Sequence, residues 1–373
     1  MKRAVVLLAC LVLLASAYGA HAEEQASTGE PGRLFAVVQE GKWGFIDQTG
    51  KVVIEPQFAG VENKETWMML ALRGPGIIAA PEFPHVESFA EGLTAVQDGK
   101  SGKWGYIDKT GDMVIQPQFD KAYGFSEGLA AVVAGKKYGY IDKTGATVIK
   151  PQYDYGLAFS EGLARITIGE KYGFIDKTGA MVIKPNLDWA WSFSEGLVAA
   201  HKGGFKKGKS GYIESKFGYM DKTGQWVIEP QFALAGHFSE GLAAVRVGFG
   251  GSGYIDKTGN MVINPEFKES VESFHEGLAP AKVGVGGKWG YIDKTGDMVI
   301  QPQFDKAYGF SEGLAAVVAG KKYGYIDKTG NMVIKPQFDG DPGNFSGGLA
   351  AIRVGGKLGY IDKTGKLVWR PQE

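Results

Sequence analysis

Two short glycine-rich stretches have the residue types and spacing that bind phosphate groups in other proteins. Residues 203–210 fit the pattern G-x-x-x-x-G-K-[ST], and residues 248–253 fit the pattern G-x-G-x-x-G. Both patterns need a strand before the loop and a helix after it, because the helix N-terminus completes the phosphate site. Strand-like sequence follows the first match and flanks the second. We therefore expect two loops and no nucleotide cofactor.

Acidic residues recur too regularly to form a catalytic pair. A Tyr/Phe-Ile/Met-Asp-x-Thr-Gly motif occurs nine times, with its aspartate at positions 47, 108, 142, 176, 221, 256, 293, 327 and 362. Acid–base catalysis needs carboxylates in unlike environments, and a calcium site needs several oxygen ligands close together. An aspartate copied into every unit fits the capping of a turn better. We expect no metal and no enzymatic activity.

The histidines give no better support for catalysis. His85, His201, His237 and His275 lack the spacing of metal ligands and have no nucleophile motif beside them. An envelope hydrolase is therefore the least favoured of the functions considered.

The motif positions define a repeat of about 34 residues. Successive aspartates are 61, 34, 34, 45, 35, 37, 34 and 35 residues apart. The longest spacing indicates a decayed unit at about 61–95, and the spacing of 45 contains an insertion at about 202–216. Residues 102–145 recur letter for letter as 287–330. We expect a repeat domain over residues 35–373 with about ten units.

One unit predicts a three-stranded antiparallel meander. Residues 129–133, 138–142 and 147–149 are strand-like, and Asp142-Lys-Thr-Gly145 has the chemistry of a turn. Pro151 ends the third strand, because proline has no backbone donor. An irregular link through Tyr153 and Phe159 is expected to follow. Gly139 lies inside a strand, which indicates close approach of a neighbouring ring or backbone, and we expect it to set the spacing between units.

The units must stack to be stable. A lone unit loses on the order of 1.5 kcal/mol of conformational entropy per ordered residue and buries too little apolar surface to offset this loss. The predicted fold class is therefore all-β, a tandem array of three-stranded antiparallel units. The number of units favours an open curved solenoid or superhelix. A propeller-like closed ring is the alternative.

The N-terminus and the composition bear on location. Residues 1–22 have a basic start, an apolar run and Ala20-His21-Ala22, which indicate a secretory signal peptide followed by a linker at 23–34. Cys10 is the single cysteine, and lipid anchoring through it is not expected. No later stretch is long and apolar enough for an integral membrane protein. The 41 basic and 41 acidic residues give no reason to expect nucleic acid.

Several motifs carry a resemblance to a known family. Residues 41–47, 102–108 and 287–293 share the pattern Gly-Lys-Trp-Gly-Phe/Tyr-Ile-Asp and resemble the WG repeats, also called KWG repeats. Several other units replace the tryptophan, mostly by another aromatic residue. The resemblance extends over nearly all of residues 35–371. It implies a bacterial β-repeat protein, often exported, with a binding role and no established reaction, substrate or cofactor.

Candidate binding residues are those that break the repeat. Trp189 and Trp191 are singular among the units and suit contact with a glycan or a protein if they are exposed, whereas burial in the link is the alternative. Lys206, Lys207 and Lys209 make the insertion basic and suit an anionic partner. The residue before each strand-ending proline varies in type but stays polar, which predicts an exposed row.

These observations lead to a functional hypothesis. We expect an exported protein, periplasmic or secreted, that acts as a non-enzymatic binding scaffold for an envelope or extracellular protein through an extended repeat surface. A carbohydrate or cell-wall binding module is the alternative, in which case a glycan is the partner.

Overall fold

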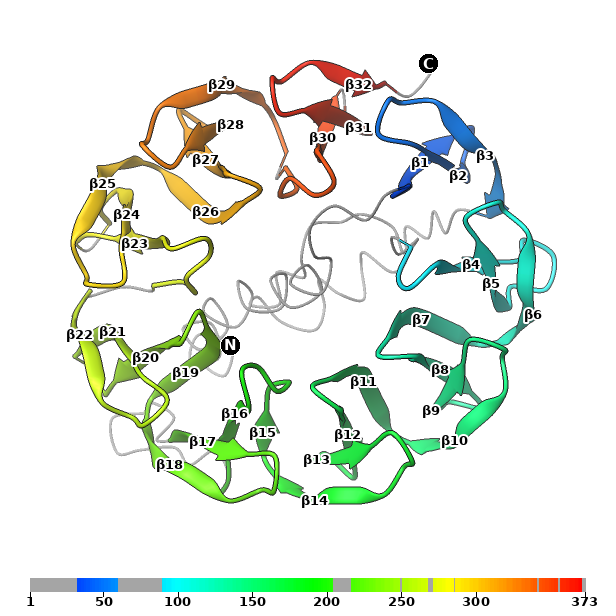
Figure 1. The fold of residues 1–373 in the computed structure, drawn as a ribbon, viewed down its shortest axis with the longest axis horizontal. Coiled ribbons are helices and arrows are strands. Elements are labelled where there is room, and N and C mark those ends of the chain that lie inside the picture. Colours follow the sequence, from blue (N-terminus) through cyan, green and yellow to red (C-terminus); the bar gives the residue numbers. More distant parts are fainter. Residues whose placement is uncertain are drawn as a thin grey trace, which may run out of the picture.

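The described residues form a closed ring of nine small antiparallel sheets, which we call blades 1 to 9 in chain order (Figure 1). This computed structural model describes residues 32–59, 89–203, 216–248, 250–267, 271–284, 286–340, 342–354 and 356–370. The C-terminal blade lies beside the N-terminal blade, so the ring closes (Figure 1). Within these residues no helix is long and apolar enough to cross a membrane.

Each blade is built from consecutive strands. Blade 1 contains β1 (Phe35–Gln39), β2 (Lys42–Ile46) and β3 (Val52–Ala59). Blade 2 contains β4 (Leu93–Gln97), β5 (Trp104–Asp108) and β6 (Met113–Phe119). Blade 3 contains β7 (Lys121–Ser126), β8 (Leu129–Ala134), β9 (Lys137–Asp142) and β10 (Thr147–Tyr153). Blades 4 and 5 contain β11 (Tyr155–Ser160), β12 (Leu163–Ile168), β13 (Lys171–Asp176) and β14 (Met181–Leu187); and β15 (Trp189–Ala190), β16 (Leu197–His201), β17 (Phe217–Asp221) and β18 (Trp226–Phe232).

The second half of the ring follows the same order. Blades 6 and 7 contain β19 (Leu234–Ser239), β20 (Leu242–Val247), β21 (Gly251–Ile255) and β22 (Met261–Phe267); and β23 (Ala279–Lys282), β24 (Trp289–Ile292) and β25 (Met298–Phe304). Blades 8 and 9 contain β26 (Lys306–Ser311), β27 (Leu314–Ala319), β28 (Lys322–Asp327) and β29 (Met332–Phe338); and β30 (Leu349–Val354), β31 (Lys357–Asp362) and β32 (Leu367–Trp369).

The all-β tandem array is confirmed, with two differences in detail. Of the two arrangements considered, the structure shows the propeller-like ring and not the open solenoid that we favoured. The expected irregular link also forms a strand in five blades; in blade 4 this strand is β11, which pairs with β12 and gives a four-stranded sheet. These additional strands are the ones closest to the centre of the ring (Figure 1).

The predicted segment boundaries are only partly visible. Residues 1–22 and most of the linker at 23–34 lie outside the described residues. The decayed unit at about 61–95 is described only from residue 89, and its end starts blade 2 with β4. The insertion at about 202–216 is described only at its two ends. The hairpin turn expected at 248–253 is present between β20 and β21, where the Gly250 amide donates to the Val247 carbonyl at 2.9 Å.

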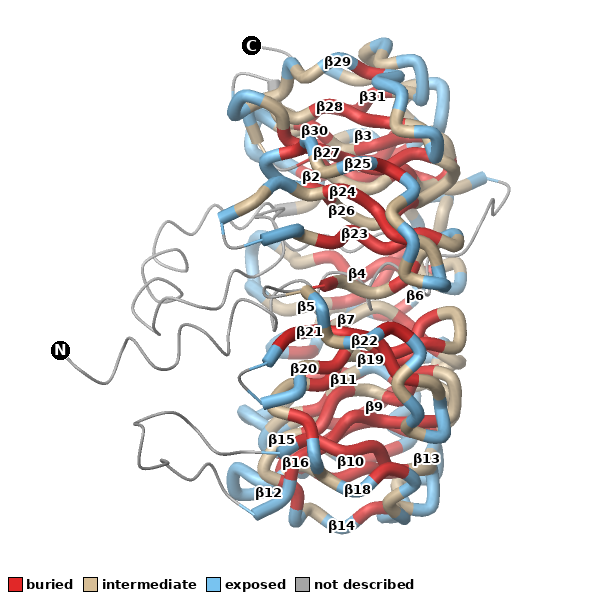
Figure 2. Tube along the Cα trace, turned by 90° about the vertical axis from the view of Figure 1, so that its left-hand side faces the viewer, coloured by how far each residue is buried: buried red, intermediate tan, exposed pale blue. Residues whose placement is uncertain are grey.

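The hydrophobic core lies between blades rather than within them. One cluster combines Tyr106 and Ile115 of blade 2 with Phe125 and Ala130 of blade 3. Buried residues occupy the middle of the ring wall, and exposed turns cover both of its faces (Figure 2). Each blade therefore needs a neighbour on both sides, and ring closure supplies one to the first and the last.

Two glycines of the repeat have separate roles. A β-carbon on Gly139 would lie 2.6 Å from the carbonyl oxygen of Ile149, on the next strand of the same blade. The expected close approach is thus to backbone, but it does not set the spacing between units. Gly145 does, because it has a φ of +86° and a β-carbon there would lie 3.0 Å from the side chain of Ile115 in the preceding blade.

Candidate functional site

The repeated aspartates cap the turns that contain them. Asp142 accepts hydrogen bonds from the Thr144 amide at 2.9 Å, the Thr144 hydroxyl at 2.6 Å and the Ala146 amide at 3.1 Å. The hydrogen bond from the Thr144 hydroxyl is the main cause of the lowered pKa of Asp142. The same geometry occurs at all nine positions. A carboxylate held this way is a structural acceptor.

The repeated glutamates join consecutive blades. Glu127 of blade 3 accepts a hydrogen bond from the Gly162 amide of blade 4 at 3.0 Å and pairs with Lys177 of blade 4 at 3.0 Å. We call this arrangement the Glu–Lys clasp. It is present at seven consecutive junctions, and its glutamates are Glu91, Glu127, Glu161, Glu195, Glu240, Glu276 and Glu312.

A second ion pair links blades through the opposite hairpin turns. Lys137 at the start of β9 pairs with Asp154 in the link to blade 4 at 2.5 Å. Asp154 also accepts a hydrogen bond at 2.8 Å from the amide of Gly169, in the turn between β12 and β13. The recurring charged residues on both faces are thus used to hold blades together.

Partly buried aromatic side chains form a row across blades 3 to 5. This aromatic row consists of Tyr123, Tyr138, Tyr155, Tyr172 and Trp189. The ring centroids of Tyr138 and Tyr155 are 5.0 Å apart, and those of Tyr172 and Trp189 are 5.4 Å apart. Tyr155 and Tyr172 lie on strands that flank β12. The row thus continues through three consecutive blades.

Trp189 and Trp191, which the sequence singled out, lie together at the end of this row. Trp191 is 4% exposed and its indole Nε1 donates to the Ala235 carbonyl of blade 6 at 3.2 Å. Its position matches the buried alternative of the sequence analysis. Trp189 is partly buried, and its Nε1 is buried with no hydrogen-bond partner. Lys206, Lys207 and Lys209 lie outside the described residues.

A buried arginine accompanies the tryptophans and was not expected from the sequence. Arg165 on β12 is 4% exposed, and its guanidinium donates to the Ala190 carbonyl of blade 5. The guanidinium carbon also lies 5.1 Å from the ring centre of Tyr172. Most other blades have alanine at this place, for example Ala131 and Ala199, and blade 7 has Pro280, so only comparison of the repeats could have indicated the arginine.

The outer strands of the ring expose a regular surface. Eight valines on these strands are between 37% and 48% exposed: Val53, Val114, Val148, Val182, Val227, Val262, Val299 and Val333. Two residues after each valine comes the polar residue that precedes the proline, and this residue is exposed as predicted. We call these valines and polar residues the outer belt.

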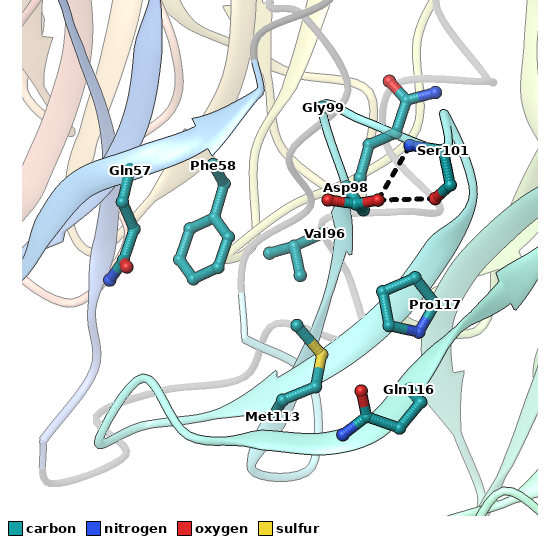
Figure 3. Close-up of a pocket in the computed structure, with 10 residues that line it drawn as sticks. Gln57, Phe58, Val96, Asp98, Gly99, Ser101, Met113, Gln116 and Pro117 are labelled. Carbon is teal, nitrogen blue, oxygen red and sulfur yellow. Dashed lines mark hydrogen bonds between the residues drawn. The ribbon is translucent and has the colours of Figure 1, made fainter.

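A hollow of about 440 Å³ lies between blades 1 and 2 (Figure 3). Phe58 of β3 borders it on one side, and Met113 and Pro117 of β6 border it on the other (Figure 3). Its polar lining includes Gln57, Asp98 and Gln116. These side chains come from three separate parts of the chain, so no pattern in the sequence indicates that they meet.

Comparison with known proteins agrees with the repeat and the fold. The family described as WG containing repeat matches residues 43–63, 104–138, 138–172, 172–204, 217–248, 253–289, 289–323 and 323–357. No curated protein matches the sequence.

Among solved structures, a crystal structure of a eukaryotic initiation factor is 12% identical, with a TM-score of 0.59, and the match covers 91% of this chain and 95% of that one. The computationally designed Ika8 protein is 14% identical, with a TM-score of 0.44, and coverages of 75% and 93%. Apo AztD from Citrobacter koseri is also 14% identical, with a TM-score of 0.41, and coverages of 84% and 96%. At these identities, the similarity to the initiation factor concerns the fold alone.

Proposed function

We propose that this chain, which belongs to the WG containing repeat family, is a non-enzymatic binding scaffold of the bacterial cell envelope. In this proposal the ring presents an extended repeat surface to a partner protein. The observation that carries the proposal is the outer belt, where exposed valines alternate with exposed polar residues around consecutive blades. Protein interfaces combine an apolar centre with a polar rim, and both kinds of side chain lie side by side on this surface.

The use of the acidic residues supports a binding role over a catalytic one. The repeated aspartates are occupied by their own turns, and the repeated glutamates are occupied by the Glu–Lys clasps. A general acid or base needs a carboxylate that can reach a substrate, in an environment unlike that of its neighbours. The variable polar residue before each proline lies instead on the outer belt, where it is exposed.

The proposed location rests on the first residues of the chain. Residues 1–22 have the three parts of a secretory signal peptide, and the sequence after them contains no cysteine. Export to the periplasm or the medium follows from this interpretation. Fractionation of cells that express a C-terminally tagged chain, together with N-terminal sequencing of the product, tests the location directly.

In-cell crosslinking tests the partner. A photo-crosslinking amino acid at Val148 or Val299 is expected to capture a reproducible envelope protein. The double variant Val148→Asp and Val182→Asp should reduce the yield of that protein at least tenfold. The matched control is Lys136→Asp, which changes an exposed turn outside the outer belt. Capture that is unchanged by the valine substitutions would overturn the proposal, and deletion of residues 202–216 tests whether the basic insertion takes part.

The aromatic row favours a second candidate function, a carbohydrate or cell-wall binding module. Aromatic rings with a polar edge pack against the apolar faces of sugar rings. We expect the intact chain to be retained on insoluble glycan and the Tyr155→Ala and Trp189→Ala variants to elute earlier. Equal retention of all three would remove the aromatic row as the glycan-binding surface.

A further inference from the structure

The lining of the hollow between blades 1 and 2 combines an apolar wall with neutral hydrogen-bonding groups. Phe58, Met113 and Pro117 provide the apolar part, and the amides of Gln57 and Gln116 can each donate and accept (Figure 3). The described residues that line the hollow include no lysine, arginine or histidine. A volume of about 440 Å³ is in the range of small-molecule sites.

One wall of the hollow is fixed in place by hydrogen bonds within the hairpin between β4 and β5. The Ser101 amide and hydroxyl donate to the Asp98 carboxylate at 2.8 Å and 2.6 Å (Figure 3). The side-chain amide of Gln97 donates to the Gly102 carbonyl at 2.7 Å. The hydrogen bond from Ser101 lowers the pKa of Asp98, so this carboxylate stays ionised as an acceptor at neutral pH. A wall that is already ordered loses less entropy when a ligand binds.

The junction between blades 6 and 7 provides an internal comparison. Phe267 pairs with Ser252 in the register in which Phe58 pairs with Trp43, and Met298 and Pro302 repeat Met113 and Pro117. The three apolar residues of the hollow therefore have counterparts at the junction of blades 6 and 7.

Of the polar residues, Gln116 recurs as Gln301, but the others are not repeated. Where blades 1 and 2 have Gln57, Gln97 and Asp98, blades 6 and 7 have Glu266, Lys282 and Val283. The combination of neutral amides with one fixed carboxylate thus occurs at the junction of blades 1 and 2 and is replaced by other chemistry at the corresponding place.

We propose that the hollow between blades 1 and 2 is a binding site for a neutral saccharide of one or two sugar units. A pyranose ring has an apolar face of C–H groups, which matches the ring of Phe58 and the side chains opposite it. Its hydroxyl groups both donate and accept, as the glutamine amides do, and an ionised carboxylate accepts from two hydroxyls. The absence of a cation from the described lining disfavours phosphate or an acidic sugar.

This proposal goes beyond the outer-belt function, and of the residues that line the hollow it shares Gln116 with the outer belt. It also differs from glycan contact at the aromatic row, which lies on blades 3 to 5. The three surfaces can therefore be tested separately by substitution.

Saturation-transfer NMR on the mature chain with three probes, cellobiose, maltose and N,N′-diacetylchitobiose, tests the site. At least one disaccharide should receive saturation on its ring C–H protons, and titration calorimetry should give its affinity. Loss of one well-placed contact weakens binding about tenfold. We expect this loss for Gln57→Ala, an exposed residue that does not contribute to the core, and a larger loss for Phe58→Ala.

Matched substitutions at blades 6 and 7 serve as controls. Phe267→Ala and Glu266→Ala should leave the affinity unchanged, as should Tyr155→Ala in the aromatic row. If none of the three disaccharides receives saturation from the protein, the proposal is overturned. Equal losses from the control substitutions, or binding of the probe peptide acetyl-trialanine amide with the disaccharides inactive, would overturn it as well.

Discussion

The junction that closes the ring differs from the junctions between blades that are consecutive in the chain. Between blades 3 and 4, Tyr140 and Phe159 pack with ring centroids 5.0 Å apart, and the Tyr140 hydroxyl donates to the Leu157 carbonyl at 2.8 Å. Leu157 belongs to β11, the innermost strand of blade 4. We call this junction regular, because the same contacts recur around the ring.

The closing junction, between blades 9 and 1, also has a contact between two aromatic rings and a hydrogen bond from a tyrosine, but residues at other positions of the blade form them. Tyr360 donates to the Ala36 carbonyl at 2.9 Å and packs on Phe35 with centroids 5.5 Å apart. Both acceptor and ring come from β1, which corresponds to the second strand of a four-stranded blade. Trp369 takes the register position that isoleucine has in the other blades, and Gly50 meets the backbone at Val368 instead of an isoleucine side chain.

The Glu–Lys clasp is also missing from the closing junction. Gly347 stands where blades 2 to 8 have glutamate, and Gln48 stands where the other blades have lysine. Among the described residues, β30 to β32 and β1 to β3 form separate sheets, so blades 9 and 1 share no strand. Side-chain packing and the hydrogen bond from Tyr360 connect these two blades, and we expect the ring to open at this junction first.

Substitution by alanine of Phe159 at a regular junction and of Phe35 at the closing junction should show the largest difference between the two kinds of junction. Phe159 is fully buried, so Phe159→Ala should lower the free energy of unfolding of the ring by about 3–5 kcal/mol. Phe35→Ala should instead release blade 9 from blade 1 while the other blades remain stacked, because repeat units depend on their nearest neighbours. Hydrogen exchange followed by mass spectrometry should show fast exchange confined to β1 and β31 in Phe35→Ala. Uniform loss of protection in both variants would mean that the junctions are equivalent.

Removal of the tyrosine hydroxyl at each junction should give a smaller difference in hydrogen exchange between the closing junction and a regular one. Tyr360→Phe and Tyr140→Phe each delete one buried hydrogen bond, which contributes about 1 kcal/mol. Phe45 and Phe174 occupy the same position in blades 1 and 4, so the ring tolerates phenylalanine there. Because the closing junction has no clasp, Tyr360→Phe should increase exchange at β31 more than Tyr140→Phe does at β9. Denaturant unfolding provides the global free energies for the same pair.

The sequence predicted the repeat but not the ring closure, for a physical reason. Turn chemistry at Asp142 to Gly145 and the alternation of residues in the strands are local, so one unit contains enough information to predict its strands. Closure depends on Tyr360 and Ala36, which are 324 residues apart. It also depends on the small rotation between blades, which follows from contacts such as Gly145 on Ile115 and not from any pattern within a unit.

The candidate sites also divide into those that local sequence predicts and those that depend on contacts between distant residues. The exposed polar residues of the outer belt were predicted, because the position before each proline varies while remaining polar, whereas the exposed valines were not. For Trp189 and Trp191 the sequence left exposure and burial open, since an aromatic residue suits either environment. The hollow was missed because Phe58, Asp98 and Met113 meet only when blades 1 and 2 stack.

Low pH should weaken the regular junctions and so reduce the difference in stability between them and the closing junction. Burial alone would raise the pKa of Glu91, Glu240 and Glu312, but the paired lysine and the glycine amide hold the pKa of each below its ordinary value. A carboxyl whose pKa is lowered by folding stabilises the fold above its unfolded pKa of about 4.3, and this contribution is lost as the pH falls through the folded pKa. Exchange at the clasped turns should therefore increase between pH 5 and pH 3 by more than exchange at the closing junction, after correction for intrinsic rates. Equal increases at both would mean that the clasps do not stabilise the junctions.

Introduction of a clasp at the closing junction should have the smallest effect and tests the comparison most directly. Gly347 has a φ of +61°, close to the values of 51° to 55° that the clasp glutamates adopt, so glutamate fits the backbone there. A β-carbon at this position would lie 2.8 Å from the δ-carbon of Arg33, whose long side chain can shift to make room. The double variant Gly347→Glu and Gln48→Lys should therefore stabilise the ring by about 0.5 kcal/mol and slow exchange at β1. Gly347→Glu alone should not stabilise the ring, because the glutamate then has no lysine partner. If the single variant is stabilised as much as the double variant, the ion pair is not what strengthens a regular junction.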